Sequence, residues 1–184
     1  MDANDILLLG DPRLYRVSVP VAGDEFPAMR PVADRLHGAL MDFRRLYGVG
    51  RAIAAPQVGV MKRLIYMDTG RPVVFINPVL TELSPETMEL WDDCMSFPLL
   101  LVRLNRHKSC RITFYDLDGR EQSMLLVGDL AELLQHEYDH LDGILAIDRA
   151  IDGRAFKWRR APAAAAGISP GMDNKGTFSH PGSG

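Results

Sequence analysis

The sequence predicts an α+β fold, and three observations support that prediction. Five short segments are rich in β-branched, aromatic and aliphatic residues and are bounded by Gly, Pro and Asp, as strands are: 63–68, 73–76, 99–104, 110–115 and 123–127. Asp116-Leu117-Asp118-Gly119, between the last two segments, has the composition of a hairpin turn. Two longer segments carry apolar residues at helical spacing.

The two helices have recognisable ends. The first is expected to begin at Pro31, which suits a helix start, and to end at Gly48. The second is expected to follow Gly128, with Asp129 as its cap and Glu132 completing a capping box. The remaining segments are expected to be less regular: an extended arm over 6–21, an acidic segment over 82–93 and a basic helix end over 149–160. Within the acidic segment, Glu82, Glu86 and Glu89 are expected in a solvated loop.

Length and composition predict one domain followed by a tail. The chain has 184 residues, of which 47% are hydrophobic and 24% charged, enough to bury one core over residues 1–160. Residues 161–184 are dominated by Ala, Pro, Gly and Ser, which predicts a flexible tail. The two cysteines do not suggest a disulfide framework.

Charge and hydropathy exclude some partners. The net charge of −3 argues against nucleic-acid binding, and no apolar run approaches the length of a membrane span. The first residues lack the features of a signal or transit peptide. We therefore expect a cytoplasmic protein, or one in an organelle matrix if a transit peptide is absent from this chain.

The second helix contains the sequence His-Glu-x-x-His. Its 3.6-residue repeat places His136 and His140 on the same face, where both imidazoles can bind one metal ion. Glu137 lies beside the first histidine and can act on a water molecule at that ion. The alternative is a charged helix turn exposed to solvent.

Two histidines do not complete a catalytic metal site, which usually takes three protein ligands. A downstream glutamate ligand is excluded because no Glu follows Glu137, and Ala146 stands where a third histidine would be expected in another common motif. Asp148 remains a formal candidate. Upstream, Cys94 offers a thiolate, a good ligand for a borderline or soft divalent metal.

Three segments together resemble the signature motifs of peptide deformylases. They are Gly50-Arg51-Ala52-Ile53-Ala54-Ala55-Pro56-Gln57, Asp92-Asp93-Cys94-Met95-Ser96 and Gln135-His136-Glu137-Tyr138-Asp139-His140, in that family's order and at similar separations. The resemblance covers roughly residues 6 to 150. It implies antiparallel β-sheets packed around a central helix that carries the His-Glu-x-x-His motif. It also implies an enzyme that removes the formyl group from the N-terminal methionine of new chains.

The resemblance assigns roles to individual residues. It implies that Cys94, His136 and His140 bind one divalent ion, with Fe²⁺ expected and Zn²⁺, Ni²⁺ or Co²⁺ as substitutes. Glu137 is expected to accept a proton from water and return it to the departing amine. The Gln57 side-chain amide and the backbone N–H of Met95 are expected to stabilise the oxyanion.

The resemblance also places Gly50, Ala52 and Arg106 beside the substrate peptide. Three positions depart from the family pattern: Ala52 and Asp93 stand where Gly is usual, and Asp92 stands for the usual Glu. Asp93 is expected to hold the metal's positive charge more strongly if it faces the site. These departures characterise a divergent member and leave open reduced activity or a different acyl group.

Two alternatives to deformylation follow from these departures. The first is a metalloamidase acting on another N-acyl group, and the second is a metal-stabilised protein that binds N-formyl peptides without turnover. The expected partner is an N-formyl-methionyl peptide or nascent chain. A ribosome contact is a further hypothesis, through the basic residues Arg154, Lys157, Arg159 and Arg160.

Overall fold

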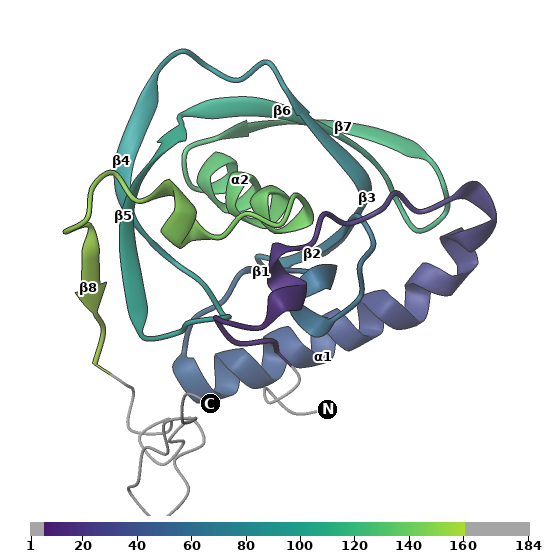
Figure 1. Ribbon diagram of the computed structural model, residues 1–184. Coiled ribbons are helices and arrows are strands. Elements are labelled where there is room, and N and C mark those ends of the chain that lie inside the picture. The colour runs from purple at the N-terminus through teal and green to yellow at the C-terminus, as the bar shows by residue number, and fades with distance from the viewer. Residues whose placement is uncertain (1–5, 161–184) are drawn as a thin grey trace, which may run out of the picture.

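The computed structural model describes residues 6–160, so the predicted tail over 161–184 lies outside the described part of the chain. Two antiparallel sheets enclose one helix (Figure 1). The larger sheet has the order β1-β2-β3-β6-β7 and the smaller one the order β4-β5-β8. The strands of the larger sheet are β1 (Ala52–Ala54), β2 (Leu64–Asp68), β3 (Pro72–Thr81), β6 (Ser109–Tyr115) and β7 (Glu121–Val127). Those of the smaller sheet are β4 (Thr87–Asp93), β5 (Leu100–His107) and β8 (Phe156–Trp158).

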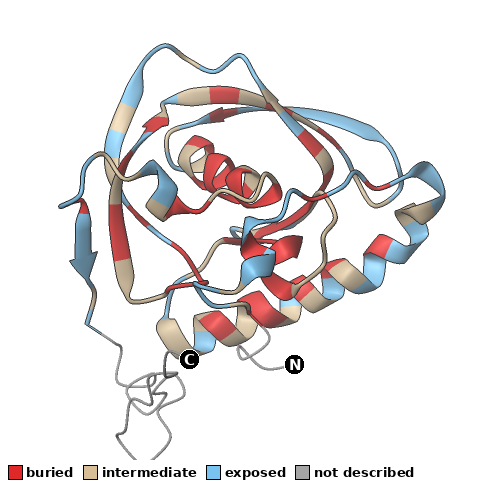
Figure 2. Ribbon diagram, viewed as in Figure 1, coloured by how far each residue is buried: buried red, intermediate tan, exposed pale blue. Residues whose placement is uncertain are grey.

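The enclosed helix is α2 (Asp129–Leu141), and it carries the His-Glu-x-x-His sequence. It contacts strands of both sheets, among them β1, β7 and β5. Figure 2 shows that most of this helix is buried, including polar residues of the motif. Burying polar groups is costly unless they find partners, so this helix must be surrounded by groups that satisfy them. The predicted fold class is confirmed.

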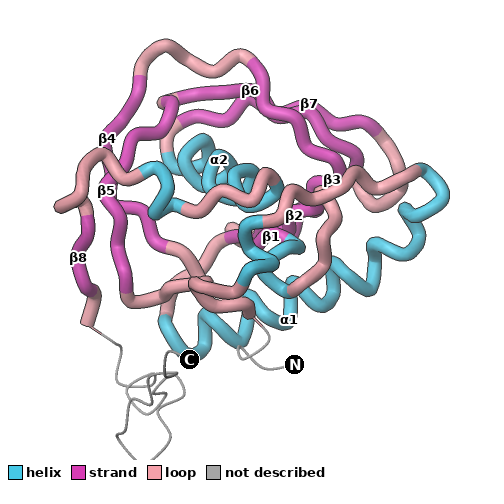
Figure 3. The backbone as a smooth tube through the Cα atoms, viewed as in Figure 1, coloured by secondary structure: helices cyan, strands magenta, loops and turns pink. Residues whose placement is uncertain are grey.

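The longer helix, α1 (Met29–Tyr47), runs along the outside of the larger sheet (Figure 3). Its buried residues Ala33, Leu36, Leu40 and Phe43 follow helical spacing and pack on the β1 and β2 side of the core. The helix ends at Gly48, whose φ of +71° is the left-handed conformation that glycine adopts at little cost.

The N-terminal arm holds two of the motif segments in place. Its backbone donates hydrogen bonds from Leu7 to the carbonyl of Gln57 (2.8 Å) and from Leu9 to that of Ser96 (2.9 Å). A short 3₁₀ helix, η2 (Pro12–Tyr15), interrupts the extended conformation that the sequence predicts. Further 3₁₀ turns are η3 (Gly23–Ala28), η4 (Ala55–Val58) and η5 (Ala146–Arg149).

Three predictions about local structure were wrong. The acidic segment 82–93 contains strand β4, in which Glu89, Trp91 and Asp93 point outward while Asp92 is buried. The predicted basic helix end contains strand β8, which pairs with β5. The capping box is absent, because Gly128 occupies the cap position without a side-chain hydrogen bond.

None of the helices within residues 6–160 combines enough length and apolar character to cross a lipid bilayer.

Candidate active site

Cys94, His136 and His140 meet in the buried space between the two sheets. Cys94 follows the last residue of β4, and the two histidines lie one turn apart on α2. The Sγ atom of Cys94 is 3.2 Å from Nε2 of His140, and one potential ligand atom from each of the three residues lies within 4.8 Å of the others. A thiol and two imidazoles at this separation fit one divalent ion.

A buried carboxylate orients His136. Oδ2 of Asp92 accepts a hydrogen bond from Nδ1 of His136 at 3.0 Å, which leaves Nε2 for the cluster. Burial alone would raise the pKa of Asp92, but the adjacent His136 ring and the Arg106 guanidinium outweigh it and hold the pKa well below its usual range. Asp92 is therefore a charged partner that fixes the orientation of the His136 ring.

Arg106 lies behind the site, which corrects the prediction that it contacts the peptide. Its side chain is 3% exposed and donates from Nη2 to Asp92 at 2.9 Å and from Nη1 to Asp139. Asp139 is also paired with Arg149 at 2.5 Å. With both arms of its guanidinium engaged, Arg106 connects β5 to β4 and α2 and cannot reach a substrate.

Glu137 presents an unpaired carboxylate oxygen to the site. Its Oε2 atom is buried and has no hydrogen-bond partner within residues 6–160. Burial raises the pKa of the Glu137 carboxyl to about 7, because the neighbouring His136 only partly offsets the loss of solvation. A carboxyl group with a pKa near neutrality and a free oxygen is suited to proton transfer.

Gln57 is held with its amide nitrogen directed at Cys94. Oε1 of Gln57 accepts a hydrogen bond from the backbone N–H of Ala54 at 2.9 Å, which fixes the side chain. Nε2 of Gln57 then lies 3.6 Å from Sγ of Cys94 and 3.3 Å from Oγ of Ser96. Ser96 is the last residue of the segment Asp92–Ser96 and had no predicted role.

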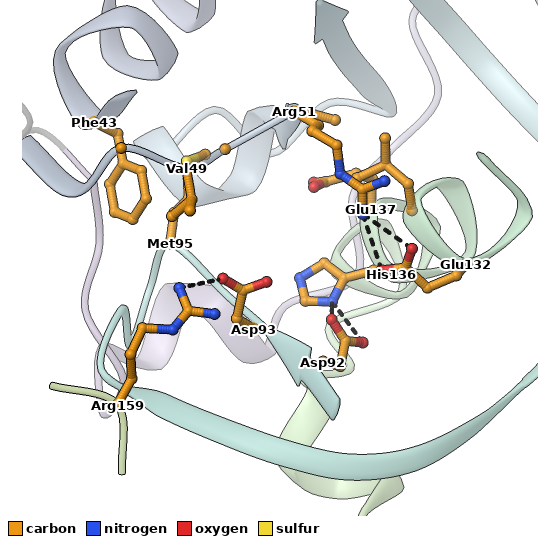
Figure 4. Close-up of a pocket in the computed structure, with 14 residues that line it drawn as sticks. Phe43, Val49, Arg51, Asp92, Asp93, Met95, Glu132, His136, Glu137 and Arg159 are labelled. Carbon is orange, nitrogen blue, oxygen red and sulfur yellow. Dashed lines mark hydrogen bonds and ion pairs between the residues drawn. The ribbon is translucent and has the colours of Figure 1, made fainter. Parts of the chain in front are cut away.

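A cavity of about 370 Å³ opens beside the cluster (Figure 4). Of the residues predicted at the site, it is lined by Gly50, Ala52, Met95, His136 and Glu137. Residues that the sequence analysis did not assign to the site also line it: Phe43, Gly48, Val49, Arg51, Glu132 and Leu133. Arg51 belongs to the first motif segment but had no predicted role, whereas the position of the other five depends on how α1, β1 and α2 pack together.

Gly50 and Ala52, both predicted to lie beside the substrate, differ in backbone conformation. Gly50 has a φ of +120°, and a Cβ atom there would lie 3.2 Å from Cδ1 of Leu40 and 3.3 Å from Cδ1 of Phe43. Ala52 lies in β1 paired with Met67, and its φ is not positive. Its methyl group therefore introduces no backbone strain, although glycine is usual at this position of the motif.

Asp93 is at the edge of the cavity, where its side chain is 42% exposed and paired with Arg159 at 2.9 Å (Figure 4). From the sequence, this carboxylate was expected to strengthen the hold on the metal if it faced the site. Instead, the guanidinium of Arg159 compensates the negative charge of Asp93. The same contact places Arg159, predicted as part of a ribosome contact, in the lining of the cavity.

A helix that presents two histidines to a neighbouring thiol, with a free carboxylate oxygen beside them, defines the site of a metal-dependent hydrolase. The family model described as polypeptide deformylase matches residues 3–155. The peptide deformylase of Thermotoga petrophila is 36% identical over 156 residues, which span 84% of this chain and 92% of that relative. The chain belongs to the peptide deformylase family, whose members remove N-formyl groups from nascent polypeptides.

Other relatives agree with this assignment. The peptide deformylase of Rhizobium meliloti is 34% identical over 154 residues, covering 80% of this chain and 85% of that relative. The crystal structure of the peptide deformylase from Thermotoga maritima matches with a TM-score of 0.73 at 34% identity, over 80% of this chain and 97% of that one. Together with the Cys-His-His cluster, the family indicates a single metal ion.

Proposed function

We propose that the cluster of Cys94, His136 and His140, with Glu137 and Gln57 beside it, is where this chain hydrolyses the formyl amide. The observation that carries the proposal is the close approach of the three ligand atoms, within 4.8 Å, next to the unpaired Oε2 of Glu137. These three side chains would hold a divalent ion, which would supply Lewis acidity and lower the pKa of water towards neutrality.

The surrounding residues transfer the proton, stabilise the oxyanion and orient His136. Glu137 accepts a proton from the attacking water and returns it to the amine when the C–N bond breaks, so the products are formate and a free N-terminus. Nε2 of Gln57 and the backbone N–H of Met95 donate to the oxyanion that forms on the formyl carbon. Asp92 keeps the ring of His136 in the orientation a ligand needs.

Fe²⁺ is the ion we propose for the native enzyme, with Zn²⁺, Ni²⁺ and Co²⁺ able to occupy the same donors. One thiolate and two imidazoles suit all four ions, so availability rather than ligand type selects among them. Metal analysis of protein purified without oxygen tests this. Iron at one equivalent per chain is expected, and zinc at one equivalent with no iron would contradict the proposal.

The substrate is proposed to bind in the cavity beside the cluster. A peptide deformylase from Acinetobacter baumannii, 27% identical with a TM-score of 0.72 over 78% of this chain, has been solved with Met-Ala-Ser bound. We expect the metal-loaded protein to release formate from formyl-Met-Ala-Ser and no acetate from acetyl-Met-Ala-Ser. Faster release of acetate would favour the alternative of a metalloamidase for another acyl group. Binding without either product would favour a protein that has lost turnover.

A ribosome contact is retained as a proposal for three of the four basic residues. Arg154, Lys157 and Arg160 are exposed, whereas Arg159 is paired with Asp93. Neutralising the three exposed residues is expected to reduce co-sedimentation with ribosomes. Unchanged co-sedimentation would reject the contact.

A further inference from the structure

An ion pair between Arg51 and Glu132 forms part of the cavity wall. Nη2 of Arg51, immediately before β1, lies 3.0 and 3.2 Å from the two carboxylate oxygens of Glu132 (Figure 4). Glu132 is on α2, one helical turn before His136, and its side chain is only 15% exposed. Both residues line the cavity beside the metal cluster.

The side chain of the formylated residue must lie near this wall. Only the amide nitrogen and Cα separate its Cβ from the formyl carbon, so the side chain binds next to the reacting groups. On α2 the neighbours of His136 along the cavity are Glu132 and Leu133, one turn earlier. In the other charged pair of the lining, Asp93 is 42% and Arg159 31% exposed, against 15% for Glu132 and 42% for Arg51. Glu132 is the less exposed of the two carboxylates, so we assign its pair to the side-chain subsite and the pair of Asp93 to the outgoing peptide.

A wall made of an ion pair has consequences for which side chains fit. A purely aliphatic side chain removes water from Arg51 and Glu132 and offers no hydrogen bond in exchange, which is unfavourable. Arg51 still has donors to offer: Nη1 makes only a 3.5 Å contact to the carbonyl of Asp129, and Nε has no hydrogen-bond partner within residues 6–160. A neutral group with an acceptor atom satisfies these donors, whereas a charged group meets a like charge in one of the two partners.

We propose that the Arg51–Glu132 pair is a specificity determinant that adapts this subsite to linear, neutral side chains ending in a hydrogen-bond acceptor, such as glutamine or methionine sulfoxide. The inference rests on the proposed location of the reaction at Cys94, His136 and His140. The aliphatic stem of Arg51, with Leu133, contacts the methylene groups of the substrate, and methionine itself remains a substrate.

The test compares kcat/KM of the metal-loaded protein for formyl-X-Ala-Ser peptides in which X is norleucine, methionine, methionine sulfoxide or glutamine. The double variant Arg51→Met, Glu132→Leu replaces both charges with apolar groups of similar length. We expect the glutamine-to-norleucine ratio of kcat/KM to fall at least about tenfold in this variant. A change of less than about twofold, with both proteins active, would overturn the inference.

A matched control is the double variant Arg111→Met, Glu82→Leu, which removes a 2.9 Å surface pair outside the cavity lining. It should leave the ratio unchanged. If the first variant fails to fold, the unaltered protein still decides the matter. Glutamine and methionine sulfoxide peptides within about tenfold of methionine support the inference, and a loss of about a thousandfold for both overturns it. Absence of turnover for every formyl peptide would instead refute the proposed function.

Discussion

Replacing Arg106 with methionine should lower the free energy of unfolding and leave the KM for the peptide substrate largely unchanged. The guanidinium is 3% exposed and lies between Asp92, which is 2% exposed, and Asp139, which is 8% exposed. Removing one member of a buried ion-pair network typically costs about 3–5 kcal/mol, because charges are left without compensation. Asp139 keeps Arg149, so most of the cost falls on Asp92 and we expect about 3 kcal/mol.

Urea unfolding of the metal-loaded protein measures this cost. The matched control is Arg111→Met, which removes a guanidinium that is 37% exposed from its pair with Glu82 and should cost less than about 1 kcal/mol. Equal losses of unfolding free energy in the two variants would refute the structural role of Arg106. An increase in KM for formyl-Met-Ala-Ser without a loss of stability would restore the substrate contact predicted from sequence.

Three further predictions concern the oxyanion, the backbone and the metal. Gln57→Glu keeps the acceptor for the N–H of Ala54 but removes the amide N–H that donates to the oxyanion, so kcat in steady-state assays should fall about a hundredfold or more. An unchanged kcat would exclude Gln57 from the oxyanion site. Gly143→Ala should cost more than about 2 kcal/mol by thermal unfolding, because φ is +70° and the new Cβ would lie 2.6 Å from the carbonyl oxygen of Tyr15. In the control Gly153→Ala, the new Cβ has no neighbour within 4 Å, so the change should stay within about 0.5 kcal/mol, and similar losses in both would contradict the argument. Removing the metal with a chelator should lower the free energy of unfolding by about 4 kcal/mol relative to protein with metal at a thousandfold over its dissociation constant. Adding the metal back should restore it. An unchanged unfolding midpoint would argue against a metal held by Cys94, His136 and His140.

The sequence predicted those features that local pattern controls. Helical spacing placed His136 and His140 on one buried face, and the hairpin turn at 116–119 joins β6 to β7 as expected. Strand β4 was missed because its acidic residues resembled a loop, although Met88, Leu90 and Asp92 alternate with exposed neighbours at the strand period.

Tertiary packing decided the features that the sequence could not reveal. Arg106 was assigned to the peptide by the family resemblance, but its burial depends on β5 packing against α2. Asp92 was recognised as a substitution without its role, because its contact with His136 joins residues far apart in the chain. The Arg51–Glu132 pair likewise connects a loop to a helix that lies more than seventy residues later.

The most direct test of the account measures metal content and formate release on the same samples of the unaltered protein and Glu137→Gln. Glutamine keeps the size of the side chain but cannot accept the proton from water. We predict one metal ion per chain in both proteins, turnover of formyl-Met-Ala-Ser by the unaltered protein, and at least about a hundredfold lower kcat in the variant. Equal turnover by both proteins, or none by the metal-loaded unaltered protein, would contradict the account.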